Sequence, residues 1–377
     1  MTLFKPPRES VCVKRIALIN PTKFLGNLLL SGQHIQHLAH WCAEQEIELL
    51  LVLDANFRDL FEPVFAGEGV RFVYYPRQAL LPGARRWAGV SAWLTCVREI
   101  RAFKADLAFN IEEDSVCHRL THLSGAARKV SCTGARYRFG FDQVLDIPRH
   151  GRPAGEESIW FVVRDIMQAV LQTEVPTIVQ AQGLPTLTRP HYPDMHALAS
   201  ALPESGAPAD ARPLVVLHAG ASKAYKKWPA VHFTELANRL VARGYRIGLI
   251  GAGSSDAEVN NQIVAGLGVL REHCVDYCDR LDLRQLAALL KQADLMVGND
   301  SGPSHLASAL GVPGVVIFGP TDIGIWRPLG RQTAVLNNKQ ICQTDCTRHF
   351  CRSGFACLET ITPQDVMNGL DSISRTS

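Results

Sequence analysis

The chain has 377 residues and a formal net charge of +3, and this length favours two α/β domains over one. So small a net charge argues against a dedicated nucleic-acid-binding protein. No apolar run reaches the roughly 18 residues of a membrane span, and the N-terminus lacks a secretion-signal pattern. We therefore expect a cytoplasmic protein that binds no nucleic acid and touches a membrane at most peripherally.

The first half of the chain alternates between predicted strands and helices. The first helical stretch runs from about residue 28 to residue 46. Because strand and helix alternate, we expect an open parallel sheet, which binds ligands at the carboxyl ends of its strands. Short apolar runs place the strands at 14–20, 48–53, 70–75, 106–111 and 129–132.

Polar residues gather where two of these strands end. Asn27 lies in the loop after the first strand, and Asn110 ends the fourth strand just before the acidic run 112–114. A carboxylate at this edge could take a proton from a substrate hydroxyl, so Glu112 and Asp114 are candidate general bases, with Asp114 preferred. The competing interpretation is a solvated acidic loop in which Asp114 caps the next helix.

Residues 176–213 are rich in proline, alanine and serine, which is a composition typical of linkers. Such a connection ends helices and separates folding units. We accordingly expect an N-terminal α/β domain at 1–175 and a second one at 214–340. A cysteine-rich segment with a C-terminal helix then follows at 341–377.

A strand predicted at 214–218 opens the second domain and leads into a loop that contains Ser222 and Lys226. A flexible ammonium beside a glycine-containing loop suits a phosphate group, although clustered lysines are often plain surface charge. The next predicted strand, at 245–253, ends in Gly-Ala-Gly, which is not the full dinucleotide fingerprint. We therefore expect no nicotinamide site here.

The most informative stretch is 294–320, which has the pattern of a strand, a tight loop, a helix, a turn and a second strand. Asp300 or Ser301 is expected to cap the helix. Pro303 suits its first turn because the missing N–H would be unpaired there, and Gly311 can adopt the left-handed conformation that ends a helix.

The start of this helix is a predicted anion site. Its first amides, from Gly302 onward, and the positive end of the helix dipole attract negative charge, and His305 can add a hydrogen-bond donor. A phosphate or diphosphate is the ligand that this arrangement favours. The alternative interpretation is an ordinary strand-to-helix crossover with a surface histidine.

The run GNDSGPSHLASALGVPGVVIFGPTD, beginning at Gly298, resembles the nucleotide-sugar signature of the heptosyltransferase family of inverting glycosyltransferases. The resemblance implies two Rossmann-like domains facing each other across a cleft, the glycosyltransferase B arrangement. It also implies ADP-heptose as the donor, a lipopolysaccharide inner-core sugar as the acceptor and a single displacement that inverts the anomeric carbon. No cofactor would be required for that step, and any contact with the inner membrane would be peripheral.

The same resemblance implies roles for particular residues. Lys226 would face the nucleotide diphosphate. The family's proposed general base is an aspartate in the loop after the first strand, where this chain has Asn27. An amide cannot take a proton at neutral pH, so Asn27 could position a substrate without acting as the base. The residues that correspond to the family's donor site are Ser222, Lys226, Asp300, Ser301, Gly302 and His305.

Two other functions follow from these departures. If no carboxylate replaces the base missing at Asn27, the chain would be a catalytically lapsed member that binds nucleotide sugar. The second alternative is transfer of heptose to protein hydroxyls, because one branch of the resembling family glycosylates autotransporter proteins. In that branch a C-terminal cysteine cluster holds iron.

This chain has four cysteines near its C-terminus with the spacing C-x3-C-x4-C-x5-C. Four soft ligands so close together suit a structural zinc or iron ion. Reduced thiols are an equally good interpretation, and disulfides are less favoured in a reducing compartment. The four residues are Cys342, Cys346, Cys351 and Cys357.

Two further expectations concern packing. The stretch 362–373 has a helical pattern, and the fold class implies that this helix crosses back to the first domain. Five other cysteines lie scattered among apolar residues and are predicted to be buried free thiols, as is usual in the cytosol. They are Cys12, Cys42, Cys96, Cys117 and Cys132.

Overall fold

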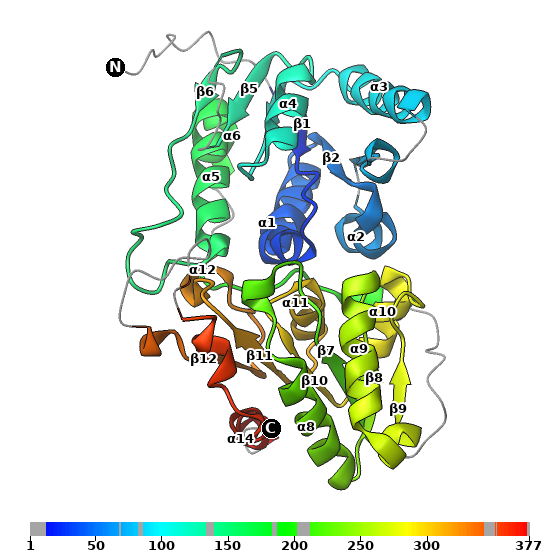
Figure 1. Cartoon of the computed structure of the whole chain (residues 1–377). Coiled ribbons are helices and arrows are strands. Elements are labelled where there is room, and N and C mark those ends of the chain that lie inside the picture. Colours follow the sequence, from blue (N-terminus) through cyan, green and yellow to red (C-terminus); the bar gives the residue numbers. More distant parts are fainter. Residues whose placement is uncertain are drawn as a thin grey trace. The chain divides into compact units, whose positions relative to one another are not determined.

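The computed structural model describes residues 13–67, 69–81, 86–132, 139–182, 187–201, 212–342, 351 and 353–374. The chain divides into two compact units, the first ending at Leu198 and the second beginning at Ala199. Each unit is a sheet covered by helices, as Figure 1 shows. The division falls inside the stretch 176–213 that the sequence predicts as a linker, although part of this stretch is helical.

The first unit is built on a six-stranded parallel sheet in the order β3-β2-β1-β4-β5-β6. Its central strands consist of buried aliphatic residues, as expected for strands covered on both faces. The strand order reverses between β1 and β4, which brings the loops after these two strands to the same point of the carboxyl edge. The strands are β1 (Arg15–Ile19), β2 (Glu48–Asp54), β3 (Val70–Tyr75), β4 (Leu107–Phe109), β5 (Arg128–Ser131) and β6 (Gln143–Val144).

Helices cover both faces of this sheet. Helices α3 and α4 bury Cys96, Ile100 and Leu120 against one face, while α1 contacts β2, α2 and α5. Helix α5 adds Trp160, which is fully buried. The helices are α1 (Leu25–Glu44), α2 (Arg58–Phe65), α3 (Arg86–Ala102), α4 (Ser115–Leu123), α5 (Ile159–Glu174), α6 (Pro176–Gln182) and α7 (His196–Ala201), with the short 3-10 helices η1 (Ala55–Phe57) and η2 (Gln78–Leu80).

The second unit repeats this architecture. Its six strands are also parallel, in the order β12-β11-β10-β7-β8-β9, and the order reverses between β7 and β10. Two Rossmann-like units are therefore confirmed as the fold class. The strands are β7 (Leu214–His218), β8 (Arg246–Leu249), β9 (Cys274–Asp276), β10 (Leu295–Asn299), β11 (Gly314–Phe318) and β12 (Thr333–Asn337).

Helices α8, α9 and α14 share one buried cluster with strands of the second sheet. Helix α11 packs against β10, β11 and α10. The helices are α8 (Ala230–Ala242), α9 (Ser254–Gly266), α10 (Leu283–Lys291), α11 (Gly302–Ala309), α12 (Ile323–Trp326), α13 (Ala356–Glu359) and α14 (Pro363–Ser374), with η3 (Ala224–Lys226), η4 (Gly268–His273) and η5 (Lys339–Ile341).

The C-terminal helix is placed differently from the expectation. Val366, Leu370 and Ile373 of α14 lie in the buried cluster of the second unit. The indole of Trp228 donates a hydrogen bond of 2.8 Å to the carbonyl of Ile361, just before the helix. Helix α14 thus completes the core of the second unit.

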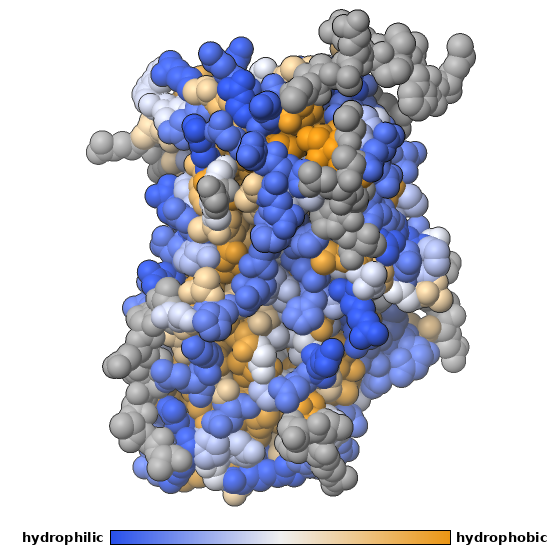
Figure 2. Space-filling view, turned by 180° about the vertical axis from the view of Figure 1, so that it is seen from behind, coloured by the Kyte–Doolittle hydropathy of each residue, from blue (hydrophilic) through white to orange (hydrophobic). Residues whose placement is uncertain are grey.

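Polar and charged side chains cover most of the face drawn in Figure 2, and apolar side chains appear there in patches between them. Within the described ranges, no helix is long and apolar enough to cross a membrane. The predicted buried thiols are confirmed for Cys42, Cys96, Cys117 and Cys132. Cys12 lies outside the described residues.

Candidate functional site

The carboxyl edge of the second sheet carries the predicted anion site. Strands β7 and β10 lie side by side at the point where the strand order reverses, and they end in His218 and Asn299. Open α/β sheets bind ligands at such a point because the loops on either side diverge and leave room. The loops that follow these two strands carry Lys226 and Asp300.

An ion pair joins these two loops. The Nζ atom of Lys226 lies 2.7 Å from Oδ2 of Asp300, whose side chain is almost fully buried. Lys226 belongs to η3 and Asp300 immediately precedes the N-cap of α11. The Asp300 carboxylate therefore holds the ammonium beside the start of α11, where the amides and dipole of that helix attract the same kind of ligand.

The expected cap of α11 is absent. Ser301 is the N-cap residue, but neither its side chain nor another makes a capping hydrogen bond. Its hydroxyl instead donates to the carbonyl of Asn299 at 3.1 Å. The predicted N-cap position of Ser301 is thus confirmed, but its side chain makes no capping hydrogen bond. Gly311 has φ +78°, as expected for the residue that ends this helix.

His305 lies in the first turn of α11 and is buried. Burial lowers the pKa of its imidazole to about 4, an effect that the charge of Lys226 reinforces and that of Asp300 opposes. The ring is therefore neutral at physiological pH. It therefore adds no positive charge to this site, and Lys226 is a cation beside the helix start.

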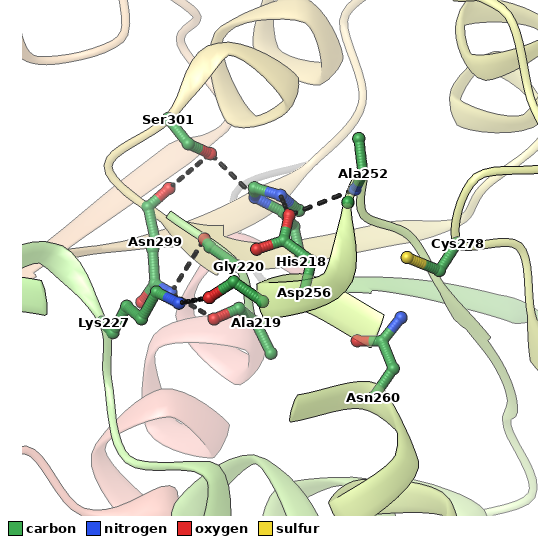
Figure 3. A network of polar contacts seen from close by, with 12 residues as sticks. His218, Ala219, Gly220, Lys227, Ala252, Asp256, Asn260, Cys278, Asn299 and Ser301 are labelled. Carbon is green, nitrogen blue, oxygen red and sulfur yellow. Dashed lines mark hydrogen bonds and ion pairs between the residues drawn. The ribbon is translucent and has the colours of Figure 1, made fainter. Parts of the chain in front are cut away.

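Behind the helix start, a polar network joins Ser301 to His218, a residue that sequence reasoning did not single out (Figure 3). Nδ1 of His218 is 2.9 Å from Oγ of Ser301, and Nε2 of His218 is 3.8 Å from the carboxylate of Asp256 in α9. Since the hydroxyl proton of Ser301 points to Asn299, Ser301 accepts from His218. The serine is thus oriented by the network and is not activated as a nucleophile.

Asp256 ties α9 to the same network. It accepts a hydrogen bond of 3.1 Å from the amide of Ala252. Burial opposes ionisation, but the nearby His218 imidazole and the hydrogen bond from the Ala252 amide hold the pKa of this carboxyl below its usual value. The backbone at Gly220 passes so close that a Cβ there would lie 2.3 Å from the Asp256 carboxylate. A side chain at position 220 would therefore have to displace the Asp256 carboxylate.

Asn299 fastens the loop after β7 to the end of β10. Its side-chain amide donates to the carbonyls of Ala219 and Gly220 at 2.9 and 3.2 Å, and its oxygen accepts from the amide of Trp228 at 3.1 Å. These bonds fix both ends of the loop that carries Lys226. Ser222 lies exposed on this loop, so it is near the site in sequence but none of the contacts described above involves it.

The carboxyl edge of the first sheet carries the three candidate catalytic residues. The side-chain amide of Asn27, in the first turn of α1, donates a hydrogen bond of 3.3 Å to Oε2 of Glu112. The structure thus joins two residues that are 85 positions apart. Burial raises the pKa of the Glu112 carboxyl to about 7, although the hydrogen bond from Asn27 and the charge of Arg149 lower it in part.

The other acidic residues of this run are engaged elsewhere. Asp114 is the N-cap of α4, and its Oδ1 accepts a hydrogen bond of 2.7 Å from the amide of Val116. Glu113 lies 3.4 Å from the guanidinium of Arg149. The capping interpretation of Asp114 therefore describes its geometry, and Glu112 is the carboxylate that lies beside Asn27.

Asn110 is a structural residue. Its side-chain amide donates to the carbonyl of Glu112 at 2.7 Å, and its oxygen accepts from the hydroxyl of Ser131 at 2.9 Å. It thereby fixes the backbone of Glu112. The signal that could have found this pairing from sequence is the adjacency of β1 and β4, because the strand order brings their loops together.

The C-terminal cysteines are only partly described. Cys346 lies outside the described residues, and within the described part of the chain no three His, Cys, Asp or Glu residues form a group suited to a metal. The sulfurs of Cys342 and Cys351 lie 3.8 and 3.5 Å from the hydroxyl of Ser353. Cys357 is buried in the apolar cluster of the second unit.

A family model described as glycosyltransferase family 9 (heptosyltransferase) matches residues 121–354. Lipopolysaccharide heptosyltransferase 2 of Salmonella typhimurium is 32% identical over 168 residues, which are 43% of this chain and 47% of that protein. Lipopolysaccharide heptosyltransferase 1 of Pseudomonas aeruginosa is 34% identical over 188 residues, 50% of this chain and 47% of that protein. The match thus spans about half the length of these curated relatives.

Solved structures resemble nearly the whole chain. The Escherichia coli ADP-heptose lipopolysaccharide heptosyltransferase II has a TM-score of 0.68 at 19% identity, covering 96% of this chain and 99% of that one. E. coli heptosyltransferase WaaC with ADP gives 0.67 at 18%, covering 95% and 99%. The dodecameric iron-containing heptosyltransferase TibC in complex with ADP-D-beta-D-heptose gives 0.54 at 15%, covering 97% and 77%. At these identities the likeness is one of fold.

Proposed function

Because this chain belongs to glycosyltransferase family 9, the heptosyltransferases, we propose that it transfers heptose from ADP-heptose to a lipopolysaccharide inner-core sugar with inversion at the anomeric carbon. The observation that carries this proposal is the Lys226–Asp300 ion pair at the uncapped start of α11. An ammonium and free helix amides together suit a diphosphate leaving group.

On the donor side, the chain contributes charge and hydrogen bonds. The first amides of α11 and the ammonium of Lys226 stabilise the negative charge that develops on ADP as it leaves. Ser301 is oriented through His218, and neutral His305 adds a hydrogen-bond donor. This displacement needs no metal or cofactor, since the leaving group carries away its own electron pair and the protein already supplies the cation.

Release of ADP from ADP-heptose, with and without heptose-deficient lipopolysaccharide, tests the proposed function. We expect release that depends on the acceptor. Donor binding without release under either condition would contradict lipopolysaccharide heptose transfer. It would favour a catalytically lapsed binding protein or a different acceptor, such as protein hydroxyls.

A cytoplasmic location with peripheral contact to the inner membrane is also part of this proposal. Reduced thiols in the described core suit the cytosol. Half of the large apolar side chains that are exposed in the described chain lie within residues 80–94, among them Trp87, Val90 and Leu94 on α3. Their spacing puts these three on one face of the helix, and Arg98 and Arg101 follow in its last turns. This combination suits an anionic bilayer surface.

Sedimentation with vesicles that contain anionic phospholipid tests the membrane contact. We expect the pair Trp87→Ser and Leu94→Ser to reduce the bound fraction several-fold, because they remove the apolar part of this surface. Val269→Ser is the matched control, since Val269 is equally exposed in the second unit. Equal binding of both variants would contradict the role of α3.

Any metal at the C-terminal cysteines would be structural in this proposal. Cys342 and Cys351 share a contact with Ser353, and the amide of Phe355 donates to the Cys351 sulfur at 3.2 Å, as amides do to metal-bound thiolates. Elemental analysis of protein purified without chelators tests this. If the cysteines hold a metal, about one iron or zinc per chain is expected, and Cys342→Ser loses it; metal-free folded protein would leave reduced thiols as the interpretation. Bound iron would also make protein hydroxyls the acceptor to test next.

A further inference from the structure

The carboxyl edge of the first sheet has an amide, Asn27 in the first turn of α1, and a carboxylate held against that amide. We propose that Glu112, held by Asn27, is the general base that takes the proton from the acceptor hydroxyl. This inference rests on the proposed glycosyl transfer and assigns a residue to its acceptor half.

Glu112 is held in place from two sides. Asn27 in α1 donates to Oε2 of Glu112 at 3.3 Å, and the Thr22 hydroxyl also hydrogen-bonds the carboxylate. On the backbone side, Asn110 donates to the Glu112 carbonyl at 2.7 Å and is itself fixed by Ser131. A base positioned in this way needs little reorganisation before it meets a hydroxyl.

Burial gives this carboxyl the ionisation that a base requires. Only 7% of Glu112 is exposed, and desolvation raises the pKa of its carboxyl to about 7 against the opposing effects of Asn27 and Arg149. A base with a pKa near the working pH is partly ionised and still basic enough to take a proton. The titratable and charged groups around it are Arg149 before α5, Asp114 and Cys117 at the start of α4, and Cys132 after β5.

The neighbouring carboxylates are less suited to the task. The Asp114 carboxylate accepts from the amide of Val116 at the helix start, so protonating it would cost the cap of α4. Glu113 is paired with Arg149 and is more exposed. Glu112, by contrast, accepts the hydrogen bond of the Asn27 amide.

The step balances with the groups at hand. The acceptor oxygen forms a bond to the anomeric carbon while the bond from that carbon to the diphosphate oxygen breaks, and the electron pair of that bond leaves with ADP. The hydroxyl proton passes to the Glu112 carboxylate, which becomes neutral and later releases the proton to solvent. No other reactant is required.

The test compares turnover and pH profiles of Glu112→Gln with those of Glu113→Gln and of the wild type. We expect Glu112→Gln to lower kcat by about 10²- to 10⁴-fold, the usual contribution of a general base, with ADP affinity unchanged. Glu113→Gln should keep wild-type kcat, and both active proteins should lose activity below an apparent pKa near 7.

A rescue experiment separates chemistry from structure. The double variant Asn27→Asp with Glu112→Gln places a carboxylate on the neighbouring side chain. We expect its kcat to be at least tenfold higher than that of Glu112→Gln alone. Asn27→Asp alone places two carboxylates 3.3 Å apart, so it should shift the pH profile to higher pH because the two groups share a proton.

Full turnover and an unchanged pH profile in Glu112→Gln would overturn the assignment while leaving the transferase activity intact. If the wild type itself transfers no heptose, the proposed function fails. Infrared titration then measures the ionisation of the Glu112 carboxyl directly. A carboxyl signal that is absent in Glu112→Gln should titrate near pH 7. Titration of this signal at the usual value for Glu, about 4.3, would contradict the inference by itself.

Discussion

Asp300 and Lys226 illustrate how single residues divide their roles in this site. The carboxylate is buried and lies 2.7 Å from the ammonium. It therefore orients Lys226 and also offsets part of the positive charge of the ammonium. A diphosphate that arrives at the start of α11 adds negative charge on the other side of the ammonium. The lysine is therefore expected to matter more for the diphosphate than for the nucleoside.

Replacing Lys226 tests that role. We expect Lys226→Met to weaken ADP binding about 10- to 100-fold, the effect of losing one hydrogen bond to a charged group, and to weaken AMP binding much less. Isothermal titration calorimetry with both nucleotides measures this. Lys223→Met is the matched control, because Lys223 is exposed in the same loop. Equal losses for ADP and AMP would contradict a specific contact with the diphosphate.

The raised pKa of Glu112 also predicts a pH dependence of stability. Its carboxyl binds a proton up to about pH 7 in the folded protein but only to about pH 4.3 when unfolded. Between these values the folded state binds more protons, so the free energy of unfolding falls as pH rises, by about 4 kcal/mol in total. Below about pH 4.3 the carboxyl is protonated in both states, so Glu112 adds no pH dependence to the free energy of unfolding there.

Glu112→Gln removes this dependence. Thermal unfolding at about pH 5 and about pH 8 should show that the variant gains stability relative to the wild type at the higher pH. Glu113→Gln should show no such gain. A wild type and Glu112→Gln that differ equally at both pH values would mean that Glu112 is ionised in the folded protein throughout this range.

At the scale of elements, the site depends on close packing of loops. The loop after β7 passes Asp256 of α9 at Gly220, where a Cβ would lie 2.3 Å from the carboxylate. Asn299 at the end of β10 binds the carbonyls of the same loop. A shift of this loop would therefore move Lys226 as well, since the lysine lies a few residues further along.

Gly220→Ala tests this coupling. The added methyl must push Asp256 or the loop aside, at about 1–3 kcal/mol of stability, and we expect ADP affinity to fall with it. Gly67→Ala is the control. A Cβ at position 67 would lie 3.7 Å from the Val70 side chain, which is an ordinary van der Waals contact. Unchanged ADP affinity in a Gly220→Ala protein of reduced stability would separate the loop packing from the donor site.

The elements that sequence reasoning predicted are the ones with strong apolar patterns. The central strands β1, β2, β7, β10 and β11 are short aliphatic runs, because both of their faces are covered. Strands β6, β9 and β12 were not predicted, and all three lie at sheet edges. Their residues are only partly buried, so the apolar signal that identifies a strand is weak there.

At the scale of the whole molecule, the same topology occurs twice. Both sheets reverse their strand order beside their first strand, and both place polar residues at that point. The sequence predicted the donor half through one continuous motif from Gly298. It favoured Asp114 over Glu112 as the base, because only the folded chain shows that Asp114 caps α4 and that Glu112 meets Asn27.

The measurement that tests the central claim most directly is the structure of the product formed from ADP-heptose and heptose-deficient lipopolysaccharide. Nuclear magnetic resonance of the purified product reports both the new bond and its anomeric configuration. We expect one added heptose, linked with a configuration opposite to that of the donor. Retention of the donor's configuration, or free heptose with no glycosylated product, would contradict it.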